Sequence, residues 1–278
     1  MSEHETASGF AAFDLGVDLL GALEELGFSE PTPIQQQAIP HALGGRDIIG
    51  RARTGSGKTL AFALPLLRSV RGQGRTPQAL VMTPTRELAL QVTAAIQELT
   101  TDLRVLTVYG GTPYPPQLNA LRKGVSVVVG TPGRLRDLVE QGALVLAQVK
   151  FLVLDEADEM LRMGFIEDVE LLLGHTTPTR QVLLFSASMP KPMRAIASKH
   201  LSNPVEVQVE EQALTVHHIQ QQWMRVPNAH KMDVLQRILT ERQTGSVLVF
   251  ARTRVACVES ADGLGTRSIR VDMLHGGL

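Results

Sequence analysis

The stretch that decides the fold is Asp47-Ile-Ile-Gly-Arg-Ala-Arg-Thr-Gly-Ser-Gly-Lys-Thr59. It runs from an apolar strand through a glycine-rich turn into a helical pattern. Gly55 and Gly57 let the backbone bend back so that its N–H groups point inward at phosphate oxygens. Lys58 can reach the β- and γ-phosphates of a nucleotide, and the Thr59 hydroxyl suits Mg²⁺. The stretch therefore predicts a phosphate-binding loop.

One residue departs from the strict form of this motif, because Ala52 stands where the pattern has glycine. A glycine-rich connector without a ligand is the alternative interpretation, and the Gly-Ser-Gly-Lys-Thr order after a strand disfavours it. The loop predicts a nucleotide without saying which one. The residues expected around the phosphates are Arg53, Thr54, Gly55, Ser56, Gly57, Lys58 and Thr59.

Short apolar segments recur along the chain and alternate with helical patterns at 86–99 and 164–173. Most are continuous apolar runs, which is typical of strands buried on both faces of a parallel sheet. We therefore expect an α/β fold with a mainly parallel central sheet and helices on both faces. The expected strands are 47–49, 79–82, 105–108, 125–129, 151–154, 182–185 and 205–209.

The strand-and-helix rhythm pauses after residue 209 and restarts a few residues later. The second part has only about sixty residues, and a doubly wound domain is rarely complete in so few. We therefore expect the second domain to be truncated. The expected organisation is a disordered tail at 1–9, a nucleotide-binding domain at 10–209, a linker at 210–216 and a partial second domain at 217–278, with strands at 218–226 and 247–250 and a helix at 231–240.

The composition excludes several classes of protein. Lysine and arginine total 27 against 28 for aspartate and glutamate, so a nucleic acid would have to bind in a local groove and not through bulk charge. The single cysteine, Cys257, excludes an internal disulfide and a zinc site made of cysteines. No apolar run approaches the roughly 18 residues of a membrane span, and residues 1–9 do not resemble a signal peptide. We expect a soluble, cytoplasmic protein with no membrane partner.

Carboxylates follow directly on the apolar segment 151–154, in the sequence Asp-Glu-Ala-Asp at 155–158. Open α/β sheets bind ligands at the carboxyl ends of their strands, which is also where the phosphate loop would lie. Asp155 can hold Mg²⁺ together with Thr59, and Glu156 can orient and deprotonate an attacking water. A solvated acidic turn is the alternative, which a neighbouring phosphate loop disfavours. The expected catalytic residues are Lys58, Asp155 and Glu156, and the expected metal ligands are Thr59 and Asp155.

Two hydroxyl side chains, Ser186 and Ser188, follow the apolar segment 182–185 and would lie at the same edge of the sheet. Hydrogen bonds from them could couple the acidic cluster, through Asp158, to distant parts of the domain. An ordinary cap between a strand and a helix is the alternative interpretation.

The Asp-Glu-Ala-Asp sequence and the order of the other motifs resemble the DEAD-box RNA helicase family. The segment from Gly27 to Gln35, Gly-Phe-Ser-Glu-Pro-Thr-Pro-Ile-Gln, looks like the family's Q motif. A glutamine amide can pair with the N6 and N7 edge of adenine, so ATP is expected over GTP. The family also has an upstream aromatic residue that stacks on the base; Phe10 matches it, with Phe13 as a nearby alternative. The resemblance adds Phe10, Phe28, Pro33 and Gln35 to the residues expected to bind the nucleotide.

Three further segments are similar to those that contact RNA in the family. Each follows an expected strand with a turn that offers backbone N–H groups, a hydroxyl or an arginine, which bind phosphates without reading bases. The resemblance implies single-stranded or duplex RNA held through its sugar-phosphate backbone, with 2′-hydroxyl contacts favouring RNA over DNA. The expected RNA-binding residues are Pro84, Thr85, Arg86, Gly110, Gly111, Thr131, Pro132, Gly133 and Arg134.

The resemblance extends from about Phe10 onward and leans toward bacterial members, including those described as heat-resistant RNA-dependent ATPases. It implies a RecA-like P-loop domain followed by the start of a second RecA-like domain. Two positions depart from the family pattern. Ser188 replaces the threonine of Ser-Ala-Thr and keeps the hydroxyl, and the end of the chain reads His-Gly-Gly-Leu in place of His-Gly-Asp-Leu.

The resemblance implies an ATP-dependent RNA helicase, in which RNA-stimulated ATP hydrolysis is coupled to RNA binding and local duplex unwinding, with ATP and Mg²⁺ as cofactors. Family members carry later arginines that complete the ATP site, and an arginine finger contributes about 10³ to 10⁵ in turnover. We therefore expect this chain to bind ATP but to hydrolyse it poorly. An ATP-gated RNA clamp that does not unwind is the alternative, and an ATPase acting on DNA or protein is another; protein partners and dimerisation through further C-terminal segments are left open.

Overall fold

The computed structural model describes residues 9–53, 55–70, 72, 74–209, 220, 222–241 and 245–276. The chain divides into two compact units, Met1–Glu210 and Glu211–Leu278. Apart from Gly9, the expected tail at 1–9 lies outside the described residues, as does the whole expected linker at 210–216. Within the described ranges, no helix is both long and apolar enough to cross a membrane.

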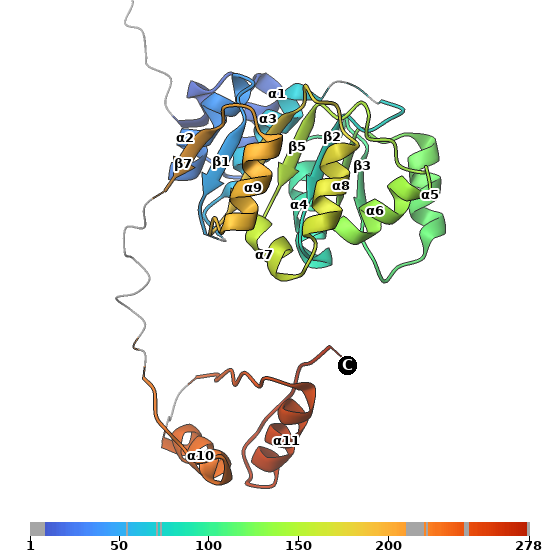
Figure 1. The fold of residues 1–278 in the computed structure, drawn as a ribbon. Helices are drawn as coiled ribbons and strands as arrows, with labels where there is room; N and C mark the ends of the chain where they lie inside the picture. Colours follow the sequence, from blue (N-terminus) through green and yellow to red (C-terminus); the bar gives the residue numbers. More distant parts are fainter. Residues whose placement is uncertain are drawn as a thin grey trace, which may run out of the picture. The chain divides into compact units, whose positions relative to one another are not determined.

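The first unit is built on one seven-stranded sheet in which every pairing is parallel (Figure 1). The strand order is β3-β4-β2-β5-β6-β1-β7. The expected mainly parallel α/β fold is thereby confirmed. The strands are β1 (Ile48–Arg51), β2 (Ala79–Met82), β3 (Val105–Val108), β4 (Val127–Gly130), β5 (Phe151–Leu154), β6 (Gln181–Ser186) and β7 (Val205–Gln208).

Helices cover both faces of this sheet. Figure 1 looks onto the face that carries α6, α8 and α9. One hydrophobic cluster joins this face to α6 (Pro132–Glu140), α7 (Ala157–Arg162), α8 (Ile166–Gly174) and α9 (Lys191–His200), with α5 (Tyr114–Lys123) packed beside it. The other cluster joins the opposite face to η1 (Gly9–Ala12), α1 (Val17–Glu25), α2 (Pro33–Leu43), α3 (Lys58–Ser69) and α4 (Arg86–Leu99).

Successive strand residues belong to opposite clusters, as the two-residue period of a strand requires. Ile48 packs in the cluster of α1–α4, whereas Ile49 packs in the cluster of α6–α9. Leu80 packs in the cluster of α6–α9 and Val81 in the cluster of α1–α4, and both are fully buried. Burial of such a side chain contributes about 1.5–3 kcal/mol. Apolar residues are therefore needed on both faces of β1 and β2, which explains why these two strands have no polar alternation.

All seven strands end at the same edge of the sheet because they are parallel. At this edge β1, β6 and β5 end side by side, and β2, β4 and β3 end side by side next to them. The turns after the first group carry the expected phosphate loop and carboxylates, whereas the expected Q-motif residues precede β1 in the chain. The turns after the second group carry the expected RNA-binding residues.

The second unit contains η2 (Asn228–His230), α10 (Lys231–Glu241) and α11 (Arg254–Gly265). The expected helix at 231–240 is confirmed, but the strands expected at 218–226 and 247–250 are wrong for the residues that the structure describes. Leu248 is 84% exposed and Phe250 is 92% exposed. An apolar run becomes a strand only when a neighbour accepts its backbone hydrogen bonds, and the described part of this unit offers 247–250 no such neighbour.

Candidate functional site

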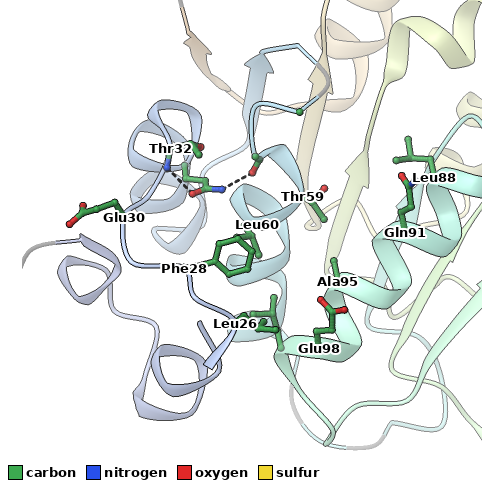
Figure 2. A pocket seen from close by; sticks show the side chains of 14 residues that line it. Leu26, Phe28, Glu30, Thr32, Thr59, Leu60, Leu88, Gln91, Ala95 and Glu98 are labelled. Atoms are coloured by element: carbon green, nitrogen blue, oxygen red, sulfur yellow. Dashed lines mark hydrogen bonds between the residues drawn. The ribbon is translucent and has the colours of Figure 1, made fainter. Parts of the chain in front are cut away.

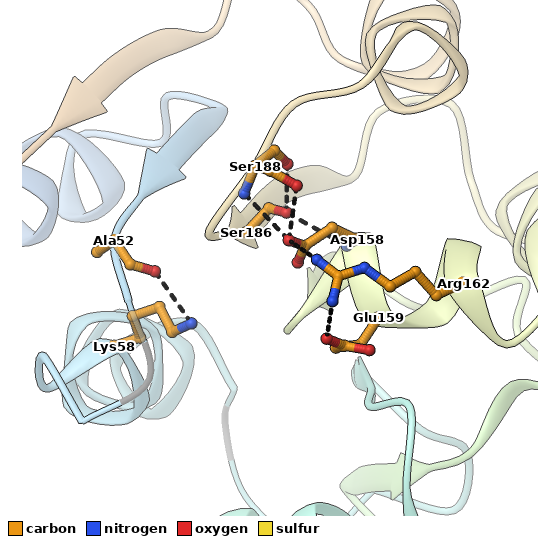
Figure 3. A network of polar contacts seen from close by, with 7 residues as sticks. All are labelled: Ala52, Lys58, Asp158, Glu159, Arg162, Ser186 and Ser188. Atoms are coloured by element: carbon orange, nitrogen blue, oxygen red, sulfur yellow. Dashed lines mark hydrogen bonds and ion pairs between the residues drawn. The ribbon is translucent and has the colours of Figure 1, made fainter. Parts of the chain in front are cut away.

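The phosphate loop joins the end of β1 to the start of α3. Gly57 is the N-cap residue of α3 and has the left-handed φ of 92°, which favours glycine. Lys58 is 6% exposed, and its Nζ donates a hydrogen bond to the carbonyl oxygen of Ala52 at 3.2 Å (Figure 3). Its ammonium therefore points back over the loop.

This loop fits a phosphate group. The Ser56 hydroxyl oxygen is buried and has no hydrogen-bond partner within the described residues. A buried hydroxyl without a partner is costly, and a ligand at the N-terminus of α3 would supply one. The positive end of the helix and Lys58 also favour an anion. Thr54, one of the expected loop residues, lies outside the described residues, and Arg53 is exposed.

Gln35 connects the Q-motif segment to the phosphate loop. Its Nε2 donates to the carbonyl oxygen of Gly57 at 2.9 Å, and its Oε1 accepts from the backbone N–H of Thr32 at 2.9 Å. The side chain is buried, and a Cβ at Gly57 would lie only 2.5 Å from Nε2. An amide still has a second N–H and a second lone pair. Neither of these takes part in the bonds to Thr32 and Gly57.

A pocket of about 400 Å³ opens beside this contact. Figure 2 shows the Phe28 side chain on one side and α4 on the other. The lining is mostly apolar, with a few polar groups near the phosphate loop, as in ligand pockets generally. The lining residues are Leu26, Phe28, Glu30, Thr32, Gln35, Gly55, Gly57, Thr59, Leu60, Leu88, Gln91, Ala95, Glu98 and Leu99.

Of the four residues that the resemblance adds to the nucleotide site, Phe10 and Pro33 do not line this pocket. Phe10 is only 4% exposed and packs edge-to-face against Phe13, with ring centroids 6.1 Å apart, inside the hydrophobic core. Pro33 is the first residue of α2, where proline's fixed φ and missing N–H suit a helix start. Phe28, which is 44% exposed, does line the pocket.

The carboxylates follow β5. Asp155 is 2% exposed; burial raises its pKa to about 6, and nearby Lys58 limits the rise. Its Oδ1 accepts a hydrogen bond from the backbone N–H of Glu156 at 3.0 Å. Glu156 has a φ of 51°, in the left-handed region that a residue other than glycine rarely adopts. Such strain costs on the order of 1–3 kcal/mol and is found where function requires it.

The two expected metal ligands suit Mg²⁺ better than a softer metal. Asp155 offers carboxylate oxygens and Thr59 a hydroxyl, and Mg²⁺ prefers oxygen ligands. Over the described ranges there is no group of three or more histidine, cysteine, aspartate or glutamate residues that could hold a metal. Mg²⁺ is usually bound by one or two carboxylates together with waters and substrate phosphates. The carboxylate of Asp155 and the hydroxyl of Thr59 fit this pattern of Mg²⁺ coordination.

A polar network joins the start of α7 to the turn after β6 (Figure 3). Asp158 Oδ2 accepts from the Ser188 hydroxyl at 2.8 Å and from the Ser188 backbone N–H at 3.1 Å. Ser186 accepts from the Asp158 backbone N–H at 3.2 Å and donates to the Ser188 carbonyl oxygen at 2.6 Å. Burial alone would raise the pKa of Asp158, but the bonds from Ser188 and Ser186 outweigh it and lower that pKa. The three residues expected to couple are thus in direct contact.

The expected RNA-binding residues lie in the turns after β2, β3 and β4. Arg86, Gly110 and Gly111 are exposed, whereas the two prolines of the set are buried. Thr85 caps α4, since its hydroxyl oxygen accepts from the Leu88 backbone N–H at 3.2 Å. The remaining members, Thr131 and Gly133, are partly buried around the start of α6.

Arg134 has a different position from the other expected RNA-binding residues. It is 8% exposed, and Nη1 and Nη2 both donate to the carbonyl oxygen of Thr112, at 3.1 and 3.0 Å. Its guanidinium also lies over the Tyr114 ring, 4.0 Å from the centroid. As placed, Arg134 supports the turn after β3 and does not face solvent.

Sequence reasoning missed two features of this edge. One is Tyr109, whose ring contacts Arg86; its place directly before Gly110-Gly111 was the only local signal. The other is the face of α4 that lines the pocket, from Leu88 to Glu98. The i, i+3, i+7 spacing of Leu88, Gln91 and Ala95 places them on one face of a helix, but the sequence does not show which element that face lies against.

Known proteins resemble this chain in sequence. The family model described as DEAD/DEAH box helicase matches residues 32–196, more than half of the chain. The chain is 44% identical over 281 residues to ATP-dependent RNA helicase DeaD of Klebsiella pneumoniae, covering 100% of this chain and 43% of that protein. It is 43% identical over 271 residues to DEAD-box ATP-dependent RNA helicase CshA of Geobacillus kaustophilus. That match covers 97% of this chain and 58% of the relative. The chain thus spans about half the length of the curated relatives it matches.

A solved structure gives the same result. The crystal structure of a DEAD box protein from the hyperthermophile Methanococcus jannaschii is 37% identical, with a TM-score of 0.71. The match covers 98% of this chain and 74% of that one. The resemblance in the motifs, the parallel RecA-like sheet and these matches agree. The chain belongs to the DEAD/DEAH box helicase family.

Proposed function

We propose that the seven-stranded unit binds ATP·Mg²⁺ and the sugar-phosphate backbone of RNA, and that the whole protein is an ATP-dependent RNA helicase. The observation that carries the proposal is the division of one sheet edge into two neighbouring halves. The phosphate loop, the carboxylates and the two serines follow or end β1, β5 and β6, and the turns expected to bind the RNA backbone follow β2, β3 and β4. The relatives named ATP-dependent RNA helicases support it as well.

In the nucleotide half, each side chain has a role that its position suits. Lys58 exchanges its bond to the Ala52 carbonyl for the β- and γ-phosphates. Asp155 and Thr59 would hold Mg²⁺, which when bound would supply positive charge that neutralises the phosphates. Glu156, held in a strained conformation at the end of β5, orients and deprotonates the attacking water. Lys58 also keeps Asp155 closer to its ionised form than burial alone would.

Base selection follows from Gln35 and Phe28. Gln35 is fixed by its bonds to Thr32 and Gly57, so its remaining N–H and lone pair have set directions. Adenine offers an acceptor at N7 and a donor at N6, which complement an amide, whereas guanine offers two acceptors at the corresponding edge. The Phe28 ring packs against the base in the pocket. ATP is therefore preferred over GTP.

In the RNA half, the available groups are backbone N–H groups at the starts of α4 and α6, the Gly110–Gly111 turn and the exposed Arg86. These groups bind phosphates and do not read bases. Binding should therefore depend strongly on salt and weakly on sequence. Contacts to 2′-hydroxyls favour RNA over DNA.

The experiment is a competition on this 278-residue chain. A labelled single-stranded RNA is displaced by unlabelled RNA or by DNA of the same length and sequence, with ATP·Mg²⁺ present. We expect RNA to compete better, and Lys58→Ala to weaken ATP binding. Equal or better competition by DNA would overturn the RNA assignment. Duplex displacement by the full-length protein then tests unwinding against clamping.

A further inference from the structure

The Arg86 guanidinium lies over the ring of Tyr109, with its carbon 4.9 Å from the ring centroid. Arg86 is the first residue of α4, after β2, and Tyr109 follows β3 directly. β4 separates these two strands in the sheet. The contact therefore spans the carboxyl end of β4 and brings two of the backbone-binding turns together.

The backbone of Tyr109 is held from two sides. Its carbonyl oxygen accepts from the Thr112 hydroxyl at 3.2 Å and from Gln117 Nε2, on α5, at 3.3 Å. Gln117 Nε2 also donates to the Thr112 hydroxyl oxygen at 2.9 Å. Arg134, from α6, holds the Thr112 carbonyl with two hydrogen bonds. The turn 109–112 is thus fixed by two helices, and the ring of Tyr109 projects from a fixed backbone.

This arrangement limits the freedom of an exposed arginine. A free arginine side chain has about 2 kcal/mol of rotamer entropy to lose when it binds a phosphate. Stacking on a ring removes part of that freedom in advance and leaves the in-plane N–H donors of the guanidinium facing outward. The positive end of the 14-residue helix α4 begins at the same residue. A phosphate at this point would meet a charge that is already in place.

We propose that Tyr109 is a positioning residue of the RNA site, which holds the Arg86 guanidinium beside the Gly110–Gly111 turn to receive a phosphodiester. The inference rests on the proposed RNA-binding function and adds to it a residue that acts through Arg86. The phenol hydroxyl makes no hydrogen bond within the described part of the chain, so the aromatic ring is the part that matters. A leucine cannot replace the ring, and a phenylalanine can.

The test is a double-mutant cycle on the affinity for a single-stranded RNA, measured by fluorescence anisotropy at fixed salt. The variants are Tyr109→Leu, Arg86→Lys and the two combined, with Tyr109→Phe as the matched control. A lysine keeps the charge but not the planar stack. We expect each single variant to weaken binding about two- to fivefold, as for an exposed cation–π pair. The double variant should be no weaker than the weaker single variant, and Tyr109→Phe should bind like the wild type.

Salt dependence separates positioning from charge. Arg86→Ala should lower the slope of log K against log salt by about one, whereas Tyr109→Leu should leave the slope unchanged because the charge remains. Fully additive losses of affinity in the double variant, or unchanged binding by Tyr109→Leu, would overturn the role proposed for Tyr109. Either result would leave the proposed RNA-binding function standing. An absence of RNA binding by the wild type would overturn the proposed function with it. Thermal midpoints of all variants check that the turn has kept its fold.

Discussion

Gln35 donates a hydrogen bond from Nε2 to the carbonyl oxygen of Gly57, at 2.9 Å. This bond joins α2 to the residue that begins α3, so the group proposed to read the base also holds the loop proposed to bind the phosphates. The close approach is possible only because Gly57 has no side chain. One side chain therefore links base recognition to the geometry of the phosphate loop.

Substitution of Gly57 tests that close approach. Gly57→Ala places a Cβ 2.5 Å from Gln35 Nε2 and 2.8 Å from the Thr32 hydroxyl, at a φ of 92°. Gly55→Ala is the matched control for backbone strain, because Gly55 has a similar φ of 82° but a Cβ added there would meet no atom within 4 Å. Each should lower the free energy of unfolding by about 1–2 kcal/mol, measured by denaturant titration. Only Gly57→Ala should also abolish the preference for ATP over GTP; equal behaviour of the two variants would contradict the account.

Substitution of Phe28 is expected to weaken ATP binding, whereas substitution of Phe10 is expected to lower stability. Phe28→Ala should weaken ATP binding, since stacking contributes about 1–3 kcal/mol per base, and should change stability little because the ring is 44% exposed. Phe10→Ala removes a buried ring and should cost about 3–5 kcal/mol of stability. ATP titration and thermal unfolding of both variants separate the roles. A stable Phe10→Ala protein with weak ATP binding would instead favour Phe10 as the stacking residue.

Asp155 should make stability depend on pH. Its pKa in the folded protein is raised to about 6 by burial, so ionisation is opposed there. Below about pH 4 the carboxyl is protonated in both folded and unfolded states and costs nothing. As pH rises through 6 the folded protein must ionise it, at a cost of up to about 3 kcal/mol. Asp155→Asn should therefore stabilise the ligand-free chain at pH 8 by up to that amount, and hardly at all near pH 4.

Denaturant titrations of wild type and Asp155→Asn at the two pH values make this comparison. A stabilisation that is the same at pH 4 and pH 8 would show that ionisation of Asp155 is not its source. The same variant should lose Mg²⁺-dependent ATP binding, because Asn lacks the charged oxygens that Mg²⁺ prefers. A variant that is both more stable and unable to bind ATP·Mg²⁺ is the expected combination.

The Ser188 hydroxyl should stabilise the ionised form of Asp158. Ser188→Ala removes a hydrogen bond of 2.8 Å to a buried carboxylate and should cost about 1.5–3 kcal/mol at pH 7. The pKa of Asp158 is lowered in the folded protein, so this stabilisation is present above the ordinary aspartate pKa and disappears as pH falls below it. Ser188→Thr keeps the hydroxyl and should stay near wild type. An equal loss in both variants, in denaturant titrations, would show that packing matters more than the bond.

The strands and helices of the first unit could be predicted because their signals are local. The segments 79–82, 105–108 and 151–154 have the same bounds in the structure, since each strand is apolar on both faces. The helix at 86–99 also has the expected bounds, because Thr85 caps it. The segment 247–250 looked the same in sequence but forms no strand among the described residues. Apolarity is local, whereas pairing needs a neighbour from elsewhere in the chain.

The candidate site was predictable in its motifs but not in its contacts. An aromatic ring in Phe10 is compatible with both base stacking and core packing, and ATP titration of Phe10→Ala is needed to separate the two. Arg134 belongs to an expected RNA segment, yet its partner Thr112 lies on another turn. The stack of Arg86 on Tyr109 likewise joins turns after strands that are not adjacent. Such contacts depend on the strand order, which the sequence does not display.

The most direct test of the central claim is the affinity of this chain for ATP·Mg²⁺ and for GTP·Mg²⁺, measured by calorimetric titration of the wild type and Gln35→Ala. A paired contact to a base edge contributes about 1–3 kcal/mol of discrimination. The account predicts that the wild type binds ATP about tenfold or more tightly than GTP, and that Gln35→Ala loses this preference. Equal binding of ATP and GTP by the wild type, or an unchanged preference in Gln35→Ala, would contradict it.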